Sequence, residues 1–138
     1  MPAHDIYHDT VKNALIKDGW TITHDPLTLE LGSTRLFVDL GAEQVIGAEK
    51  GLHKIAVEIK TFRGASEMKD LEQAIGQYVL YRIFLRRVEP DRELYLAVPQ
   101  DVVEEVFSEE YGRGFLQDEH GKLFGFDIES EEVVAWLS

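Results

Sequence analysis

Cysteine is absent from the 138 residues, and only four prolines are present. The absence of thiols excludes disulfide scaffolds, thiolate zinc sites and thiol catalysis. The longest uninterrupted apolar runs, 94–98 and 133–137, have five residues each, whereas a membrane-spanning helix needs about 20. The chain also opens without a charged and then apolar leader. We therefore expect a cytoplasmic protein that does not contact a membrane and folds without disulfides or a structural metal.

Basic side chains are scarce in the C-terminal part of the chain. Residues 100–138 contain 2 basic and 11 acidic residues, a net charge of −9, whereas residues 1–99 contain 12 and 15, a net charge of −3. Negative potential repels DNA phosphates, because non-specific affinity comes largely from Lys and Arg that displace counterions. Contact with DNA would therefore be weak for the protein alone and would need a local basic strip, a divalent metal or a more basic partner. The alternative is an acidic soluble protein with no nucleic-acid role.

The apolar pattern predicts one domain over residues 1–138, because no repeat, low-complexity tract or linker divides the chain. Helical spacing predicts helices over 4–18, from the N-cap Ser66 to about Arg87, and from Asp101 to about 110. Alternation and short apolar runs predict strands at 20–24, 34–40, 55–62, 94–98, 124–128 and 133–136. The resulting order, α-β-β-β-α-β-α-β-β, predicts an α/β (α+β) domain with a central mixed β-sheet flanked by helices.

Three charged residues on neighbouring predicted strands could carry chemistry. Asp39 ends one strand, and Glu58 and Lys60 share one face of the next because side chains alternate along a strand. Carboxylate oxygens suit Mg²⁺, which completes its coordination with water and substrate phosphate. Cleavage of a phosphodiester needs an activated water and relief of charge on the phosphate oxygens, to which a nearby ammonium contributes. The alternative is a solvated strand face with cross-strand pairing, worth roughly 0.2–1 kcal/mol.

The arrangement of Asp39, Glu58 and Lys60 between two helices resembles the PD-(D/E)xK superfamily, which includes restriction endonucleases and Holliday-junction resolvases. The resemblance implies a restriction-endonuclease-like fold, with Asp39 and Glu58 holding Mg²⁺ or Mn²⁺ and Lys60 assisting the attack. Many members carry Gln-x-x-x-Tyr on the next helix, and Gln77 with Tyr81 has that spacing.

Further candidate positions lie around these residues. Gln73 lies one turn before Gln77, and one or the other is expected to brace the lysine or the substrate backbone. His8 occupies the position of a helix-one Glu in many members, which implies that it orients water or contacts a phosphate. Arg63 and Lys69 are further candidates for phosphate contact, because they lie close to the predicted metal site in the sequence. Val38 stands where the name of the motif has Pro.

The chain as a whole resembles the XisH family, the fdxN-element excision controlling factors of cyanobacteria. The resemblance is carried by the opening His4-Asp5 and by the runs KNALIKDGW (12–20), AVEIKTF (56–62), QAIGQY (73–78), LAVP (96–99) and VAW (134–136). It implies a controlling role in programmed DNA excision, with DNA, a recombinase and a companion called XisI as partners. A metal-dependent endonuclease and a catalytically inactive adaptor of the same fold are both open interpretations. Oligomer symmetry makes a homodimer the first expectation.

Overall fold

The computed structural model describes residues 5–47 and 51–138. Along the chain the elements are α1 (His8–Lys17), β1 (Thr21–His24), β2 (Leu27–Leu31), β3 (Thr34–Val38), β4 (Leu40–Gly47), β5 (Gly51–Ile59), α2 (Glu67–Val88), β6 (Arg92–Pro99), α3 (Gln100–Glu105), α4 (Glu110–Gln117), β7 (Leu123–Asp127) and β8 (Glu132–Leu137).

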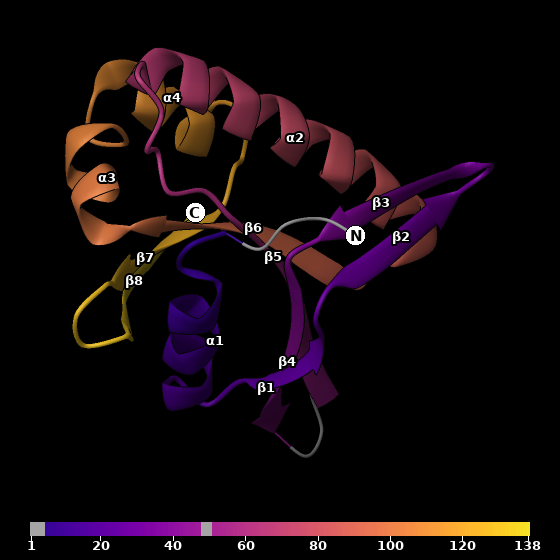
Figure 1. Cartoon of the computed structure of the whole chain (residues 1–138). Coiled ribbons are helices and arrows are strands. Elements are labelled where there is room, and N and C mark those ends of the chain that lie inside the picture. The colour runs from indigo at the N-terminus through magenta and orange to yellow at the C-terminus, as the bar shows by residue number, and fades with distance from the viewer. Residues whose placement is uncertain (1–4, 48–50) are drawn as a thin grey trace.

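Six strands form one mixed sheet in the order β1-β4-β5-β6-β7-β8, and β2 and β3 form a separate two-stranded ribbon. The central strands β5, β6 and β7 are parallel, whereas β1, β4 and β8 pair antiparallel with their neighbours. Helix α1 covers one face of the sheet, and α2, α3 and α4 cover the other (Figure 1). This arrangement confirms the predicted central mixed sheet flanked by helices.

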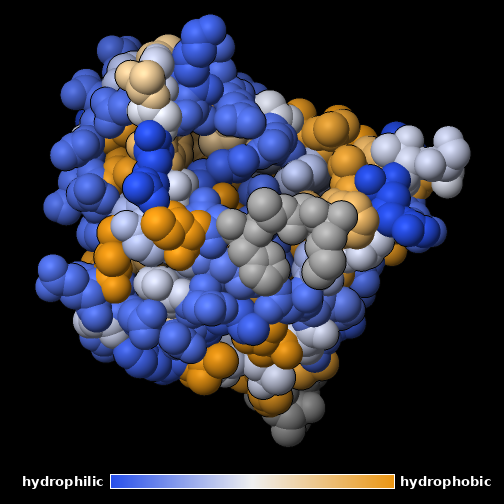
Figure 2. Space-filling model, in the orientation of Figure 1, coloured by the Kyte–Doolittle hydropathy of each residue, from blue (hydrophilic) through white to orange (hydrophobic). Residues whose placement is uncertain are grey.

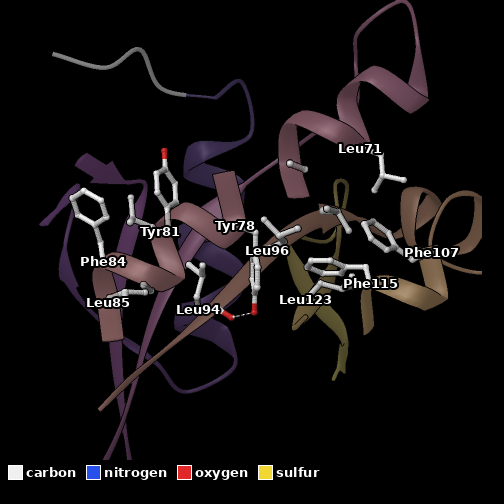
Figure 3. Close-up of a cluster of buried hydrophobic side chains, with 14 of the residues drawn as sticks. Leu71, Tyr78, Tyr81, Phe84, Leu85, Leu94, Leu96, Phe107, Phe115 and Leu123 are labelled. Atoms are coloured by element: carbon white, nitrogen blue, oxygen red, sulfur yellow. Dashed lines mark hydrogen bonds between the residues drawn. The ribbon is translucent and has the colours of Figure 1, made fainter. Parts of the chain in front are cut away.

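Each face of the sheet has its own apolar core, as the alternation of β5 requires. Ile55, Val57 and Ile59 pack on the α1 side, and Ala56 packs on the α2 side. Figure 3 shows the α2 side, where aromatic and leucine side chains of α2 meet β6 and α4. Because Glu58 follows the same alternation, its side chain lies on the α2 side of the sheet.

The predicted strand over 34–40 is in fact two strands. The chain bends at Asp39, so that β3 pairs with β2 while β4 joins the main sheet. Val38 and Leu40 are both fully buried, so the apolar alternation continues through the bend and gives no sign of it. The strand β2 was not predicted, although Leu27 and Leu29 alternate and are both buried.

One helical prediction also needs correction. The helix predicted from Asp101 to about 110 ends at Glu105 as α3, and the helix α4, which begins at Glu110, was not predicted. Gly112 marks the contact between α3 and α4, since a Cβ there would clash with the backbone of Val106. Ser66 caps α2 as predicted, and its Oγ accepts from the N–H of Lys69 at 3.3 Å. Ile83 of the same helix is exposed. Apolar residues lie on several sides of this part of α2, so helical spacing alone does not identify the buried face.

Most of the surface in Figure 2 is hydrophilic, and apolar residues appear in several separate places, one of them near the end of the β4–β5 hairpin. Val45, Ile46 and Leu52 are 72%, 53% and 49% exposed there. Among the helices of residues 5–47 and 51–138, none combines the length and the hydropathy that crossing a membrane would require.

Candidate active site

Backbone pairing brings Asp39 and Glu58 together. Leu40 pairs with Val57 across β4 and β5, so the residue before Leu40 lies beside the residue after Val57. The N–H of Asp39 donates to Oε1 of Glu58 at 3.2 Å, and the N–H of Ile59 donates to Oδ2 of Asp39 at 2.7 Å. Each carboxylate is thus fixed by the backbone of the other residue's strand segment, and this reciprocal arrangement holds both side chains at the bend.

The two carboxyl groups are shielded from solvent to different degrees. Glu58 is only 7% exposed, whereas Asp39 is half-buried. The interpretation of these residues as a solvated strand face is therefore wrong for Glu58. Burial of a carboxylate requires compensation by hydrogen bonds or a positive charge, which makes the pair a site with unusual electrostatics.

Burial, together with the proximity of the two carboxyl groups, changes how they bind protons. Burial, followed by the negative charge of Asp39, raises the pKa of Glu58 to about 8 from an ordinary value of 4.5. Burial also raises the pKa of Asp39, although its hydrogen bonds from Ile59 and Glu58 oppose the shift. One proton shared between two carboxyl groups is the expected state near neutral pH when no cation is bound.

Lys60 supplies the nearest positive charge. Its Nζ lies 3.8 Å from Oε2 of Glu58, and its side chain is 20% exposed. Its backbone N–H donates to the carbonyl of Ala97, which ties the end of β5 to β6. The structure therefore brings Asp39, Glu58 and Lys60 together, with the ammonium group open to solvent on one side.

A pocket of about 250 Å³ opens beside Lys60. Its lining includes Arg63 and Gln73, together with Asp5 and Asp70. Arg63 and Gln73, which were predicted from the sequence, are both exposed. Lys69 is also exposed, at the start of α2, but it is not part of the pocket lining. Of the three predicted residues Arg63, Lys69 and Gln73, the structure thus places Arg63 and Gln73 in the pocket beside Lys60.

Gln77 and Tyr81 lie one turn apart on α2. The side-chain oxygen of Gln77 is buried and makes no hydrogen bond within residues 5–47 and 51–138. Burial and the charges of Glu58 and Asp39 raise the pKa of Tyr81 to about 12, so its phenol stays protonated. In Figure 3 the Tyr81 hydroxyl points away from the apolar cluster, opposite to the hydroxyl of Tyr78.

His8, which the resemblance implies would orient water or contact a phosphate, is buried at the start of α1. It is 3% exposed, and its Nε2 lies 2.7 Å from Oδ1 of Asp25. Asp25 in turn pairs with Lys12 at 2.8 Å. Positive charge at His8 would oppose the rise that burial causes in the pKa of Asp39, so this network borders the site. Asp25 was not a predicted site residue, because a turn Asp before Pro26 gives no sign of a distant histidine.

The donor set fits one hard divalent cation whose coordination is completed by water and substrate. Within residues 5–47 and 51–138 no group of three or more His, Asp or Glu side chains is arranged to hold a metal ion. Two converging carboxylates are, however, the number that Mg²⁺ commonly takes from a protein. A cation would also offset the repulsion that raises the pKa of Glu58.

Comparison with known proteins gives the family. The family described as XisH protein matches residues 1–134. The structure is similar to that of an XisH family protein from Nostoc punctiforme PCC 73102, with a TM-score of 0.87, 38% identity, and coverage of 97% of this chain and 100% of that chain. It is equally similar to that of an fdxN element excision controlling factor protein from Anabaena variabilis, with a TM-score of 0.87, 39% identity, and coverage of 98% and 100%. No protein with a curated description matches the chain. The match to the family over residues 1–134, together with these structural relatives, shows that the chain belongs to the XisH family.

Proposed function

We propose that this protein controls the excision of a DNA element and carries a divalent-metal-dependent site for phosphodiester hydrolysis of the PD-(D/E)xK kind. Asp39 and Glu58 would hold the metal, and Lys60 would act on the attacking water or the scissile phosphate. The role in excision is supported by family membership and by the name of the relative from Anabaena variabilis. DNA, a recombinase, an XisI-like companion and a second copy of the chain are the partners proposed with it.

The reciprocal fixation of Asp39 and Glu58 is the observation that carries the catalytic part of this proposal. A buried carboxylate beside a half-buried one is unfavourable without a positive charge, and the ammonium of Lys60 lies 3.8 Å from one oxygen of Glu58. A fold that only needed to be stable would gain from apolar residues at these positions. Their placement at the bend, within reach of solvent, is suited to binding a cation with a phosphate.

The residues around the pair have distinct proposed roles. A bound Mg²⁺ or Mn²⁺ would supply an activated water and neutralise charge on the phosphate oxygens. Lys60 would stabilise the charge that develops on the phosphate in the transition state. The buried oxygen of Gln77 can accept a hydrogen bond from an ammonium or from water. Tyr81 would remain a neutral hydroxyl donor, since the pKa of its phenol is about 12.

The phosphate-binding roles proposed for the remaining residues follow from their positions. Arg63 and Gln73 line the pocket beside Lys60 and could contact the substrate backbone there. Lys69 could reach a longer DNA strand from the start of α2. His8 would act indirectly, because its Nε2 contacts Asp25 at 2.7 Å and the pair lies beside the site without entering it.

Incubation of the purified protein with branched, supercoiled and linear DNA in Mg²⁺ or Mn²⁺ tests the activity. We expect cleavage that EDTA abolishes and that Lys60→Ala reduces by about 10²-fold or more, because the variant loses the charge beside the phosphate. Lys17→Ala, which changes an exposed lysine of α1, serves as the matched control and should cut like wild type. Equal cutting by wild type and Lys60→Ala would contradict the proposed role of Lys60.

A second candidate function is a nuclease-fold adaptor that acts through protein contacts without cutting. The observation in its favour is the acidic C-terminal part, in which all acidic side chains of residues 100–138 are exposed except the half-buried Glu131. Such a surface suits a basic protein partner better than DNA. Calorimetric titration with the XisI-like companion at low and high salt is the test. We expect binding that weakens with salt, and no binding at low salt would contradict the adaptor function.

A further inference from the structure

A second pocket lies at the opposite end of the sheet from the carboxylate pair. It has a volume of about 270 Å³ and opens between the C-terminal half of α2 and the first residues of β6. Arg92 in its wall pairs with Lys54 in the parallel register, whereas Glu58 pairs with Leu96. Four residues of strand separate these positions, which is about 13 Å at roughly 3.3 Å per residue. The pocket is thus separate from the proposed active site.

Positive charge is concentrated around this pocket although the chain has a net charge of −12. Arg82, Arg86, Arg92 and Lys122 all line it, against a single acidic lining residue, Glu93. Two of the cations are already neutralised, because Lys122 pairs with Glu93 and Arg92 pairs with Glu89. The remaining positive charge belongs to the two arginines of α2.

Arg82 and Arg86 lie four residues apart, on one face of the helix. Neither forms a salt bridge with a carboxylate of residues 5–47 and 51–138. Arg82 instead donates to the carbonyl of Glu119 at 2.9 Å and lies over the ring of Tyr78, 5.2 Å from its centroid. These contacts hold the guanidinium at the pocket wall without cancelling its charge. The helix dipole favours cations in the last turn only, which accounts for Arg86 but not for Arg82.

The rest of the lining is partly apolar. Apolar side chains in the lining come from Leu85, Pro90 and Leu94, and His120 adds an imidazole ring. A pocket of this size and mixed lining suits a small organic anion better than a bare inorganic ion. Paired guanidinium groups match the geometry and the charge of a phosphate that carries nearly two negative charges at neutral pH.

We propose that this pocket binds a phosphomonoester, with Arg82 and Arg86 contacting the phosphate and with Leu85, Pro90 and Leu94 contacting its organic part. The ligand chemistry has two possible sources, a free nucleoside monophosphate and the 5′-phosphorylated end of a DNA strand. The proposal does not depend on catalysis by Asp39 and Glu58, because none of the groups that bind the phosphate belongs to that site.

The test is calorimetric titration of the full chain in EDTA, with AMP against adenosine and with a 5′-phosphorylated oligonucleotide against its 5′-hydroxyl form. We expect at least one phosphorylated probe to bind about tenfold more tightly than its unphosphorylated counterpart. A preference within the AMP pair identifies a free nucleotide, and a preference within the oligonucleotide pair alone identifies a DNA end. Equal binding within both pairs, or no binding at all, would overturn the proposal.

Variants distinguish binding in this pocket from binding to other basic residues on the surface. The double variant Arg82→Gln/Arg86→Gln should lose the preference for the phosphorylated probe, while Arg87→Gln should retain it, because Arg87 is exposed and does not line the pocket. Glu58→Gln should bind the probe like wild type, so that loss of nuclease activity and loss of this binding are distinguishable. Far-ultraviolet circular dichroism confirms folding. A double variant that folds and keeps the preference would contradict the assignment.

Discussion

Asp39 and Glu58 hold each other through the backbone, since the N–H of Asp39 donates to Glu58 at 3.2 Å and the N–H after Glu58 donates back to Asp39 at 2.7 Å. The bend between β3 and β4 makes this exchange possible, because it turns Asp39 away from the ribbon and toward the end of β5. The break between β3 and β4 thus creates the candidate site. The two carboxyl groups that it brings together should affect both the stability and the metal binding of the protein.

The stability of the metal-free protein should fall as the pH rises. The pKa of Glu58 is about 8 in the folded protein, against an ordinary value of 4.5. At pH values between these two, Glu58 therefore takes up a proton when the protein folds. The resulting stabilisation is complete below pH 4.5 and is lost as the pH rises through about 8. We expect the Tm in EDTA to decrease by several degrees between pH 5.5 and 8.5.

Glu58→Gln provides the control for this pH dependence. The amide keeps the acceptor for the N–H of Asp39 but has no proton to lose, so the Tm of the variant should vary less over the same interval. Burial acts to raise the pKa values of Asp25 and Glu93, but their hydrogen bonds lower both on balance, so these two carboxylates are ionised in the folded and unfolded states over this interval. Parallel pH profiles for wild type and variant would show that Glu58 is not the titrating group.

Tyr78→Phe should destabilise the protein by about 1–3 kcal/mol, because it removes a buried hydroxyl that forms hydrogen bonds with two backbone groups. The Tyr78 hydroxyl donates to the carbonyl of Leu94 at 2.9 Å, as Figure 3 shows, and accepts from the N–H of Lys122 at 3.1 Å. Urea unfolding measures the loss. The same change at the half-exposed Tyr111 should leave the free energy of unfolding within about 0.5 kcal/mol of wild type, and equal effects at both positions would refute this account of the hydrogen bonds.

Two glycine substitutions should act in opposite directions. A Cβ at Gly76, in the middle of α2, meets open space, so Gly76→Ala should stabilise the protein by about 0.5–1 kcal/mol. A Cβ at Gly121 would clash with the ring of Phe115, so Gly121→Ala should destabilise it by about 1–3 kcal/mol. Thermal unfolding of both variants checks the signs. A stabilised Gly121→Ala would mean that α4 and the segment before β7 are packed more loosely than described.

The sheet, its flanking helices and the proximity of Asp39, Glu58 and Lys60 could be predicted from the sequence, because alternation and helical spacing are local properties. Residues that alternate, such as Val57, Glu58 and Ile59, reveal which face each occupies without knowledge of the partner strand. The bend at Asp39 escaped prediction because buried residues flank it on both sides. The contact of His8 with Asp25 depends on how α1 packs beside the turn after β1, and no local pattern encodes that packing.

Binding of Mn²⁺ to the metal-free protein, measured by calorimetry at pH 8.5, tests the central claim most directly. The account predicts one site per chain in wild type, weakening of about tenfold or more in Asp39→Asn and in Glu58→Gln, and no change in Asp91→Asn, which alters an exposed carboxylate. Wild-type affinity in both site variants, or no binding by wild type at millimolar Mn²⁺, would contradict the claim that Asp39 and Glu58 form a metal site.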